Sequence, residues 1–180
     1  MRKILFVFGL LMYANAFSQV NWMTMNEAVL AQKKSPKKIL IDFYAEWCGP
    51  CKLMEKNTFG HPEIAKYINE NYYAVKFDAE GNEKVNFQGK NFENPQFNPK
   101  KKSSARGSQH QFARYMSVSG YPSMVFLDLD GSLITGLVGY FEAKDVEPYL
   151  ALIATDEYKK VKTQEEWNFY KSKFKGKVKK

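Results

Sequence analysis

The chain contains two cysteines, Cys48 and Cys51, in the sequence Cys48–Gly49–Pro50–Cys51. A thiol pair at this spacing can form a redox-active disulfide or can supply half of a metal site. A disulfide that closes so short a loop adds little stability by cross-linking. A secreted chain that relied on structural disulfides would also carry more cysteines than these two. The spacing therefore points to chemistry at the two sulfurs.

A zinc site is the rival interpretation of the cysteine pair. Zinc would need four ligands, and the two histidines, His61 and His110, are the remaining soft donors. His61 follows a predicted helix break and His110 follows a long polar segment, so neither has the spacing of a zinc ligand. We therefore expect no metal, and we expect both histidines to be surface or helix-capping residues.

The segments around the cysteines have the pattern of a strand–helix–strand unit. Residues 38–45 form a near-continuous apolar run, as in a strand that is covered on both faces. A helix should begin at the cysteine pair and run towards Asn57, because proline is tolerated in a first helical turn, where Pro50 stands. A helix over residues 62–71 and a strand over 72–78 should follow, with a right-handed crossover. The first cysteine would then lie at a helix N-terminus, where the helix dipole stabilises a thiolate.

Asp42 is the one acidic residue inside the first apolar strand, six positions before Cys48. Burying a carboxylate costs free energy unless the group has a partner or a role. Asp42 either faces solvent from an edge strand or is buried for a chemical purpose, and we favour the second interpretation.

The run Asp42–Phe43–Tyr44–Ala45–Glu46–Trp47–Cys48–Gly49–Pro50–Cys51–Lys52 strongly resembles the active-site strand and turn of thioredoxins. The resemblance extends coarsely over about residues 20–155. It implies an α/β protein with the thioredoxin fold, in which a central mixed β-sheet is flanked by helices. It also implies that Cys48 attacks the substrate disulfide and that Cys51 resolves the mixed disulfide.

The resemblance implies roles for two residues on the predicted strands. Asp42 matches the acid that relays a proton for the second cysteine. Lys76 stands where thioredoxins carry a lysine that pairs with that acid, and a plain surface position remains open for it.

The resemblance also implies a substrate-binding surface around the first cysteine. Trp47 precedes Cys48 and would form a flat apolar surface there, next to Gly49 and Pro50. The sequence Gly120–Tyr121–Pro122 precedes the third strand as the family's cis-proline loop does, and the backbone of such a loop can pair with an extended substrate peptide. Tyr121 replaces the small or branched residue that is usual there, which leaves substrate preference and redox potential open.

Residues 81–109 interrupt the regular pattern with many Asn, Gly, Pro, Gln and Lys residues. A loop of this length is usually functional or disordered. We expect this insert to lie beside the cysteine pair, because it follows a strand that ends on the side of the sheet where α/β folds place their sites. Its isolated Phe87, Phe92 and Phe97 would either pin the insert to the domain or line a substrate groove.

The remaining segments complete one thioredoxin-like domain over residues 19–160. The expected elements are a helix over 111–118, strands over 123–128 and 132–138 joined by a turn at Asp130–Gly131, and an amphipathic helix around 146–153. A capping box at 163–166 predicts a final helix, followed by a basic tail, within residues 161–180.

The first residues have the pattern of a secretory signal peptide. Arg2 and Lys3 precede the apolar run 4–12, and Ala14–Asn15–Ala16 has the small-x-small form of a cleavage site. The run is shorter than the ~20 residues that a membrane-spanning helix needs, although a buried first helix or a membrane anchor is an alternative. We therefore expect removal of residues 1–18 and export to the periplasm or the medium.

The chain is basic, with a formal net charge of +8. Lysine runs at 100–102 and 171–180 could contact nucleic acid or anionic lipid. A solvated loop and tail are the simpler interpretation, and an exported protein meets little nucleic acid, so we expect no nucleic-acid partner.

These features predict a thiol-disulfide oxidoreductase that reduces disulfides in exported proteins. Gly49–Pro50 resembles the reducing branch of the family, and residues 54–59 resemble the periplasmic thioredoxin-like domains of thiol-disulfide interchange reductases. We expect a membrane electron donor and no prosthetic group, since the Cys48–Cys51 disulfide itself carries the electrons. A disulfide oxidase or isomerase and a redox-linked peptide-binding chaperone are the alternatives, because the surroundings of the cysteines can shift the potential.

Overall fold

The computed structural model describes residues 19–100 and 106–179, so the predicted signal peptide and Lys101–Lys102 lie outside the described residues. Its central sheet has the strand order β1-β3-β2-β6-β7. The three strands β1, β3 and β2 are parallel to one another, and β6 and β7 run antiparallel. The sheet strands are β1 (Trp22–Met23), β2 (Lys38–Tyr44), β3 (Tyr72–Asp78), β6 (Ser123–Leu127) and β7 (Leu133–Val138). The predicted mixed sheet is confirmed.

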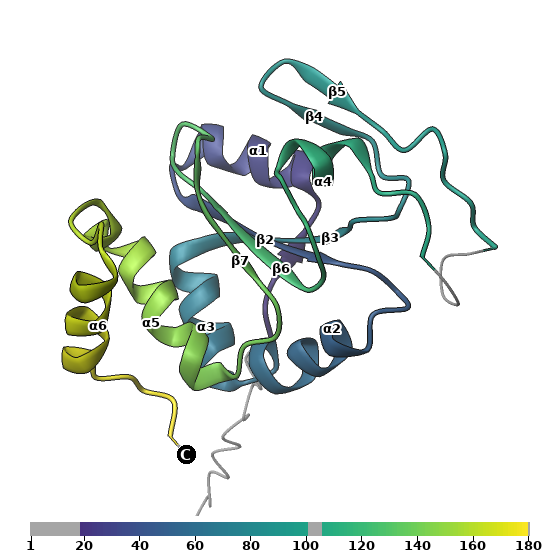
Figure 1. Cartoon of the computed structure of the whole chain (residues 1–180). Helices are drawn as coiled ribbons and strands as arrows, with labels where there is room; N and C mark the ends of the chain where they lie inside the picture. Colours follow the sequence, from purple (N-terminus) through teal and green to yellow (C-terminus); the bar gives the residue numbers. More distant parts are fainter. Residues whose placement is uncertain (1–18, 101–105, 180) are drawn as a thin grey trace, which may run out of the picture.

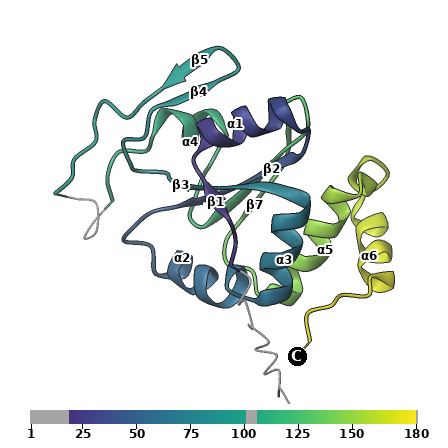
Figure 2. The same ribbon diagram turned by 180° about the vertical axis from the view of Figure 1, so that it is seen from behind.

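Helices cover both faces of the sheet (Figures 1 and 2). The helices α1 and α4 lie on one face, α2, α3 and α5 lie on the other, and α6 packs outside α5. The helices are α1 (Met25–Lys34), α2 (Gly49–Met54), α3 (Pro62–Asn71), α4 (Gln111–Tyr115), α5 (Ala143–Ala154) and α6 (Gln164–Lys173), with a π-helical turn η1 (Glu55–Phe59) and a 3₁₀ turn η2 (Glu157–Lys159).

The alternation of side chains along β2 decides which residues face the cysteines. Ile39, Ile41 and Phe43 enter the core beneath α1 and α4, whereas Leu40 enters the core on the α2 side of the sheet. Asp42 is two residues after Leu40 on the same strand, so its side chain also points to the α2 side of the sheet. It lies opposite Lys76 of β3 and Met124 of β6. Since β2 has a neighbouring strand on each side, the edge-strand interpretation of Asp42 is wrong.

The insert contains a β-hairpin, so the interpretation of residues 81–109 as one long loop is wrong for residues 85–92. Strands β4 (Val85–Phe87) and β5 (Lys90–Phe92) pair in antiparallel register. Gln88 and Gly89 between them have φ of +50° and +74°, as the two central residues of a type I′ turn require.

The phenylalanines of the insert divide into two groups. Phe87 and Phe92 are buried and pack edge-to-face on Phe112 of α4, with ring centroids 5.6 and 5.5 Å apart. Phe97 is half-exposed. The first two rings therefore pin the hairpin to the domain. Of the two predicted alternatives, pinning and lining a substrate groove, the first is confirmed for Phe87 and Phe92.

Several element boundaries differ from the sequence-based expectation. The short strand β1 was not predicted, α4 ends at Tyr115 instead of Val118, and the helix after the cysteines changes to π-helical geometry at Glu55. Across the part of the chain that the structure describes, no helix is long and apolar enough to cross a membrane.

The C-terminal segment is held against α5. Trp167 of α6 stacks on Tyr149 with ring centroids 4.2 Å apart. Beyond α6 the backbone amides of Lys177 and Val178 donate hydrogen bonds to the buried Glu147 carboxylate at 2.5 and 3.2 Å. The tail thus supplies hydrogen bonds to a carboxylate that the fold buries.

Candidate active site

Cys48 and Cys51 form a disulfide at the start of α2, with their Cα atoms 5.3 Å apart. Cys48 is the N-cap of the helix, and the backbone amide of Cys51 donates a hydrogen bond to its Sγ at 3.2 Å. Once the disulfide is reduced, this amide and the helix dipole favour a thiolate on Cys48. Gly49 and Pro50 are exposed beside the nearly buried disulfide, so a partner must approach across them.

A pocket of about 290 Å³ lies on the Cys51 side of the helix, and Asp42, Cys51, Glu55 and Lys76 are among the residues that line it. Asp42 is 3 % exposed, and its Oδ1 accepts no hydrogen bond from the described residues. Burial raises the pKa of Asp42 to about 7, and the charge of Lys76 opposes part of this rise. The buried carboxyl can therefore gain or lose a proton near neutral pH.

The direct ion pair of Lys76 is with Glu55, not with Asp42 as the resemblance implied. Glu55 directly follows α2 with helical backbone angles, and its backbone amide bonds the Cys51 carbonyl. Its carboxylate therefore lines the same pocket as Lys76 and pairs with the lysine amine there. Lys76 also lies over the Tyr44 ring, 5.2 Å from its centroid. Lys76 therefore acts on Asp42 through its charge across the pocket.

The cis-proline loop lies beside the disulfide. The Tyr121–Pro122 peptide bond is cis. The Tyr121 ring packs edge-on against Trp47, with centroids 6.0 Å apart, and both rings contact the small cluster formed by Ala45, Cys48 and Cys51. Burial, and next the charge of Glu80, raise the pKa of Tyr121 to about 12, so its hydroxyl stays neutral. The two aromatic residues with proposed substrate contacts thus form one surface.

Glu80 is a site residue that sequence analysis missed. It is 8 % exposed and lies just beyond the end of β3. Its Oε2 accepts hydrogen bonds from the Trp47 indole at 2.8 Å and from the Gly107 backbone amide at 2.7 Å. Glu80 therefore ties the end of the insert to the residue that precedes Cys48, and the expectation that the insert lies beside the cysteines holds for residues 106–109.

Both histidines cap helices. Nδ1 of His61 accepts from the Glu63 amide at the start of α3, and Nδ1 of His110 accepts from the Phe112 amide at the start of α4. His110 is fully buried, and its Nε2 lies 2.7 Å from the Glu83 carbonyl oxygen. The capping prediction is confirmed. Within the described residues, no group of three or more His, Cys, Asp and Glu side chains could hold a metal ion.

The family model of the thioredoxin-like domain matches residues 25–154, which include the disulfide, Asp42, Lys76 and the cis-proline. The chain belongs to the thioredoxin-like domain family. Curated relatives include two thiol:disulfide interchange proteins DsbD. That from Pectobacterium atrosepticum is 26 % identical over 67 % of this chain and 17 % of the relative. That from Photorhabdus laumondii is 29 % identical over 66 % of this chain and 16 % of the relative. The chain thus spans about a sixth of the length of these relatives.

Solved structures show the same fold. A thioredoxin from Thermus thermophilus gives a TM-score of 0.55 at 15 % identity and covers 77 % of this chain and 89 % of its own. A thioredoxin-fold protein from Helicobacter pylori gives a TM-score of 0.55 at 19 % identity and covers 87 % of each chain.

Glu55 and Arg106 are the other residues of this thioredoxin-like site that the sequence analysis did not assign. Glu55 lies four positions after Cys51, a spacing that puts two side chains on one face of a helix. This spacing could have assigned Glu55 to the site. Arg106 lies in the insert, with its guanidinium 5.2 Å from the centroid of the Trp47 ring. No local pattern predicts that contact, because the chain between the two residues contains α3, β3 and the β4–β5 hairpin.

Proposed function

We propose that this protein is a thiol-disulfide oxidoreductase that reduces disulfides in exported proteins. One observation carries the proposal: the Cys48–Cys51 disulfide caps a helix, and a buried carboxyl, Asp42, lines the pocket behind the second cysteine. A structural cross-link would need neither the helix N-terminus nor a buried acid that opposes folding.

The exchange takes place in two steps. In the first, the Cys48 thiolate attacks one sulfur of a substrate disulfide, forms a mixed disulfide and releases the other substrate sulfur as a thiolate. In the second, Cys51 loses its proton and attacks Cys48 Sγ, which expels the second substrate sulfur. The substrate gains two electrons and becomes a dithiol, and the two cysteines lose two electrons and become the disulfide of the structure.

Asp42 is the proposed acceptor of the Cys51 proton. Its pKa of about 7 leaves a large fraction of the carboxyl ionised at neutral pH and keeps its proton affinity high enough for general base catalysis. Trp47, Tyr121 and the backbone beside Pro122 form the proposed surface for the substrate chain, and Gly49 and Pro50 are exposed next to it.

Sequence features support the proposed direction, location and partners. The Gly49–Pro50 pair between the cysteines resembles the reducing branch of the family, and the amino-terminal pattern supports export. The likeness to part of the thiol:disulfide interchange proteins DsbD supports thiol-disulfide exchange. We propose a membrane electron donor for this protein. An exported reductase needs such a donor because each turnover leaves Cys48 and Cys51 oxidised.

Insulin reduction in the presence of excess dithiol tests the activity. The protein should speed the precipitation of insulin chains, and Cys48→Ser should be inactive under the same conditions. A wild-type rate equal to that of dithiol alone would contradict the proposal and would favour a peptide-binding chaperone.

Alkylation of the protein in cells tests the direction. Mostly reduced Cys48 and Cys51 would support a reductase, and mostly oxidised cysteines would favour an oxidase. Fractionation of the same cells tests export.

A further inference from the structure

The end of the insert forms a wall beside the disulfide. After the β4–β5 hairpin the chain returns towards α4, and residues 106–109 run next to the loop between β2 and α2 in both ribbon views (Figures 1 and 2). Two residues of this wall lie next to the aromatic pair at the disulfide. Arg106 lies over Trp47, and the Gln109 side chain lies near the Tyr121 hydroxyl.

The backbone of this wall is fixed at Gly107 and Ser108, between Arg106 and Gln109. Glu80 accepts the Gly107 amide at 2.7 Å, and Ser108 donates to the side chain of the buried Asn94 at 2.9 Å. Nε2 of Gln109 donates to the Val118 carbonyl at 2.7 Å. The wall is therefore held by contacts of the folded domain, which keep the backbone next to Arg106 beside Trp47.

Arg106 presents an available positive charge. Its side chain is exposed, and within residues 19–100 and 106–179 it forms no ion pair with a carboxylate. The nearby Glu80 is occupied by the Trp47 indole and the Gly107 amide. A guanidinium stacked on an indole keeps its outer N–H groups free, and these match the two oxygens of a carboxylate.

We propose that Arg106 makes the surface beside Cys48 selective for substrate segments that carry a carboxylate next to their disulfide. This inference rests on the proposed reductase function and adds a substrate class to it. A substrate chain that approaches Cys48 across Trp47 and the cis-proline loop passes the guanidinium. An Asp or Glu side chain near the substrate cysteine then forms a charge-assisted pair with Arg106, while a Lys or Arg at that place is repelled.

Matched peptide disulfides test the selectivity. Three peptides should differ at one position, next to a disulfide cysteine, which carries Glu, Gln or Lys. We expect the wild-type protein to reduce the Glu peptide with a kcat/KM about three- to fivefold above that of the Gln peptide, as for a solvent-accessible ion pair, and the Lys peptide more slowly than both. High salt should remove the preference. In Arg106→Gln the Glu/Gln ratio should fall to about one.

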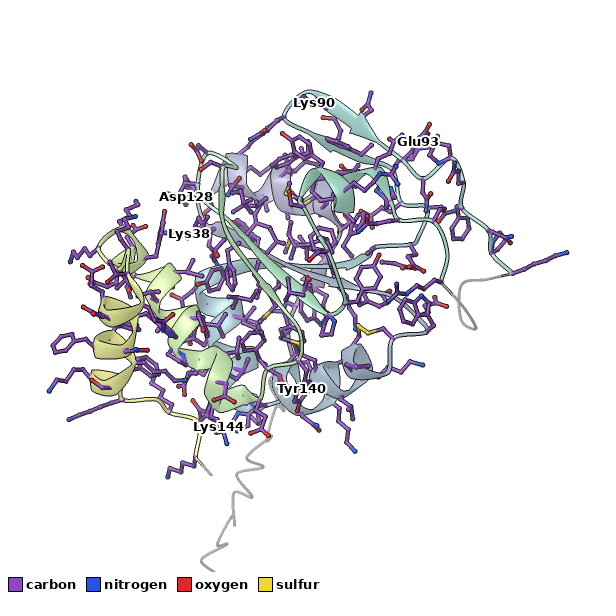
Figure 3. The ribbon with its side chains drawn as sticks, in the orientation of Figure 1. Lys38, Lys90, Glu93, Asp128, Tyr140 and Lys144 are labelled. Atoms are coloured by element: carbon purple, nitrogen blue, oxygen red, sulfur yellow. A yellow bond between two sulfur atoms is a disulfide. The ribbon has the colours of Figure 1, made fainter. Side chains whose placement is uncertain are left out.

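Lys90→Gln is the control variant. Lys90 is also a cation over an aromatic ring of the insert, 5.1 Å from the Tyr115 centroid. It lies at the tip of the β4–β5 hairpin, away from the yellow disulfide bond (Figure 3), so the variant should keep the wild-type ratio. A ratio of one in the wild type, or a ratio that Arg106→Gln leaves unchanged, would overturn the proposal.

A binding measurement separates this inference from the reductase function. Versions of the peptides with serine in place of cysteine can be titrated against the tryptophan fluorescence of the protein, to which Trp47 contributes, and this needs no turnover. Tighter binding of the Glu peptide in wild type, and its loss in Arg106→Gln, supports the selectivity even where no disulfide is reduced. Equal binding of the Glu and Gln peptides overturns it even where insulin is reduced.

Discussion

Cys48 and Cys51 differ in their surroundings, and this difference assigns their roles at the residue scale. Cys48 Sγ accepts a backbone amide at the helix start, whereas Cys51 borders the pocket that contains Asp42. We expect Cys51→Ala to accumulate covalent adducts with a disulfide substrate, because only the first sulfur attacks and the resolving thiol is gone. Cys48→Ser should form no adducts and should lose turnover completely. Non-reducing electrophoresis and mass spectrometry check both, and adducts on Cys48→Ser alone would reverse the roles.

Asp42 is a buried acid whose ionisation opposes folding. In the folded state burial raises its pKa from 3.8 to about 7. The folded protein therefore holds the proton more tightly than the unfolded chain. The stability that this proton contributes is fully present below about pH 4 and is lost as the pH rises through about 7. Above pH 7 the ionised carboxyl therefore lowers the free energy of unfolding by about 4 kcal/mol at most, which is the difference between the two pKa values expressed as energy.

Asp42→Asn should consequently stabilise the oxidised protein at pH 8 by a few kcal/mol and by much less at pH 4.5. Urea denaturation at the two pH values measures this, with Asp130→Asn as a control, since Asp130 is exposed. Equal stability gains at both pH values would contradict the assigned pKa.

The same Asp42 variant should slow the resolving step at pH 7 by about 10²-fold, as expected for the loss of a general base.

The β4–β5 hairpin shows how an element of polar composition is anchored. Phe87 is 3 % exposed and packs on Phe112 and Tyr115 of α4, with ring centroids 5.6 and 6.4 Å away. Phe87→Ala should lower the free energy of unfolding by about 3 kcal/mol, because it leaves a cavity between the hairpin and α4. Phe97→Ala, at a half-exposed position of the same insert, should cost less than about 1 kcal/mol. Denaturant titration compares the two variants, and equal losses would show that Phe97 also anchors the insert.

At the scale of the whole molecule, the C-terminal segment lies far from the chemistry. Figure 1 shows α6 and α2 on opposite sides of the molecule, with α3 and α5 between them. Deletion of residues 161–180 removes the Trp167–Tyr149 stack and the two amides that serve Glu147. We expect a loss of about 2 to 4 kcal/mol in stability and an unchanged rate with a small disulfide.

Trp167→Ala should reproduce about 1 kcal/mol of that loss by itself. Thermal unfolding gives the stability, and reduction of hydroxyethyl disulfide gives the rate. A tenfold drop in rate on deletion of residues 161–180 would mean that the segment supports the active site.

The sequence by itself determined the chemistry and the central frame. Cys48 and Cys51 at their spacing, the buried strand before them and Asp42 within it are local features, and periodicity and residue type report local features directly. The capping roles of His61 and His110 were also readable, because a cap acts on amides within its own turn.

Only the tertiary structure decided which distant residues complete the site. The partner of Lys76 is Glu55, since the packing of α2 against the sheet brings that carboxylate next to the β3 lysine. Glu80 meets Trp47 because β3 ends beside the end of β2. Arg106 meets Trp47 because the hairpin is pinned by buried rings and the chain after it returns to the disulfide. These contacts join parts of the chain that are distant in sequence, and no local pattern encodes them: their geometry exists only once the sheet, α4 and the hairpin have packed together.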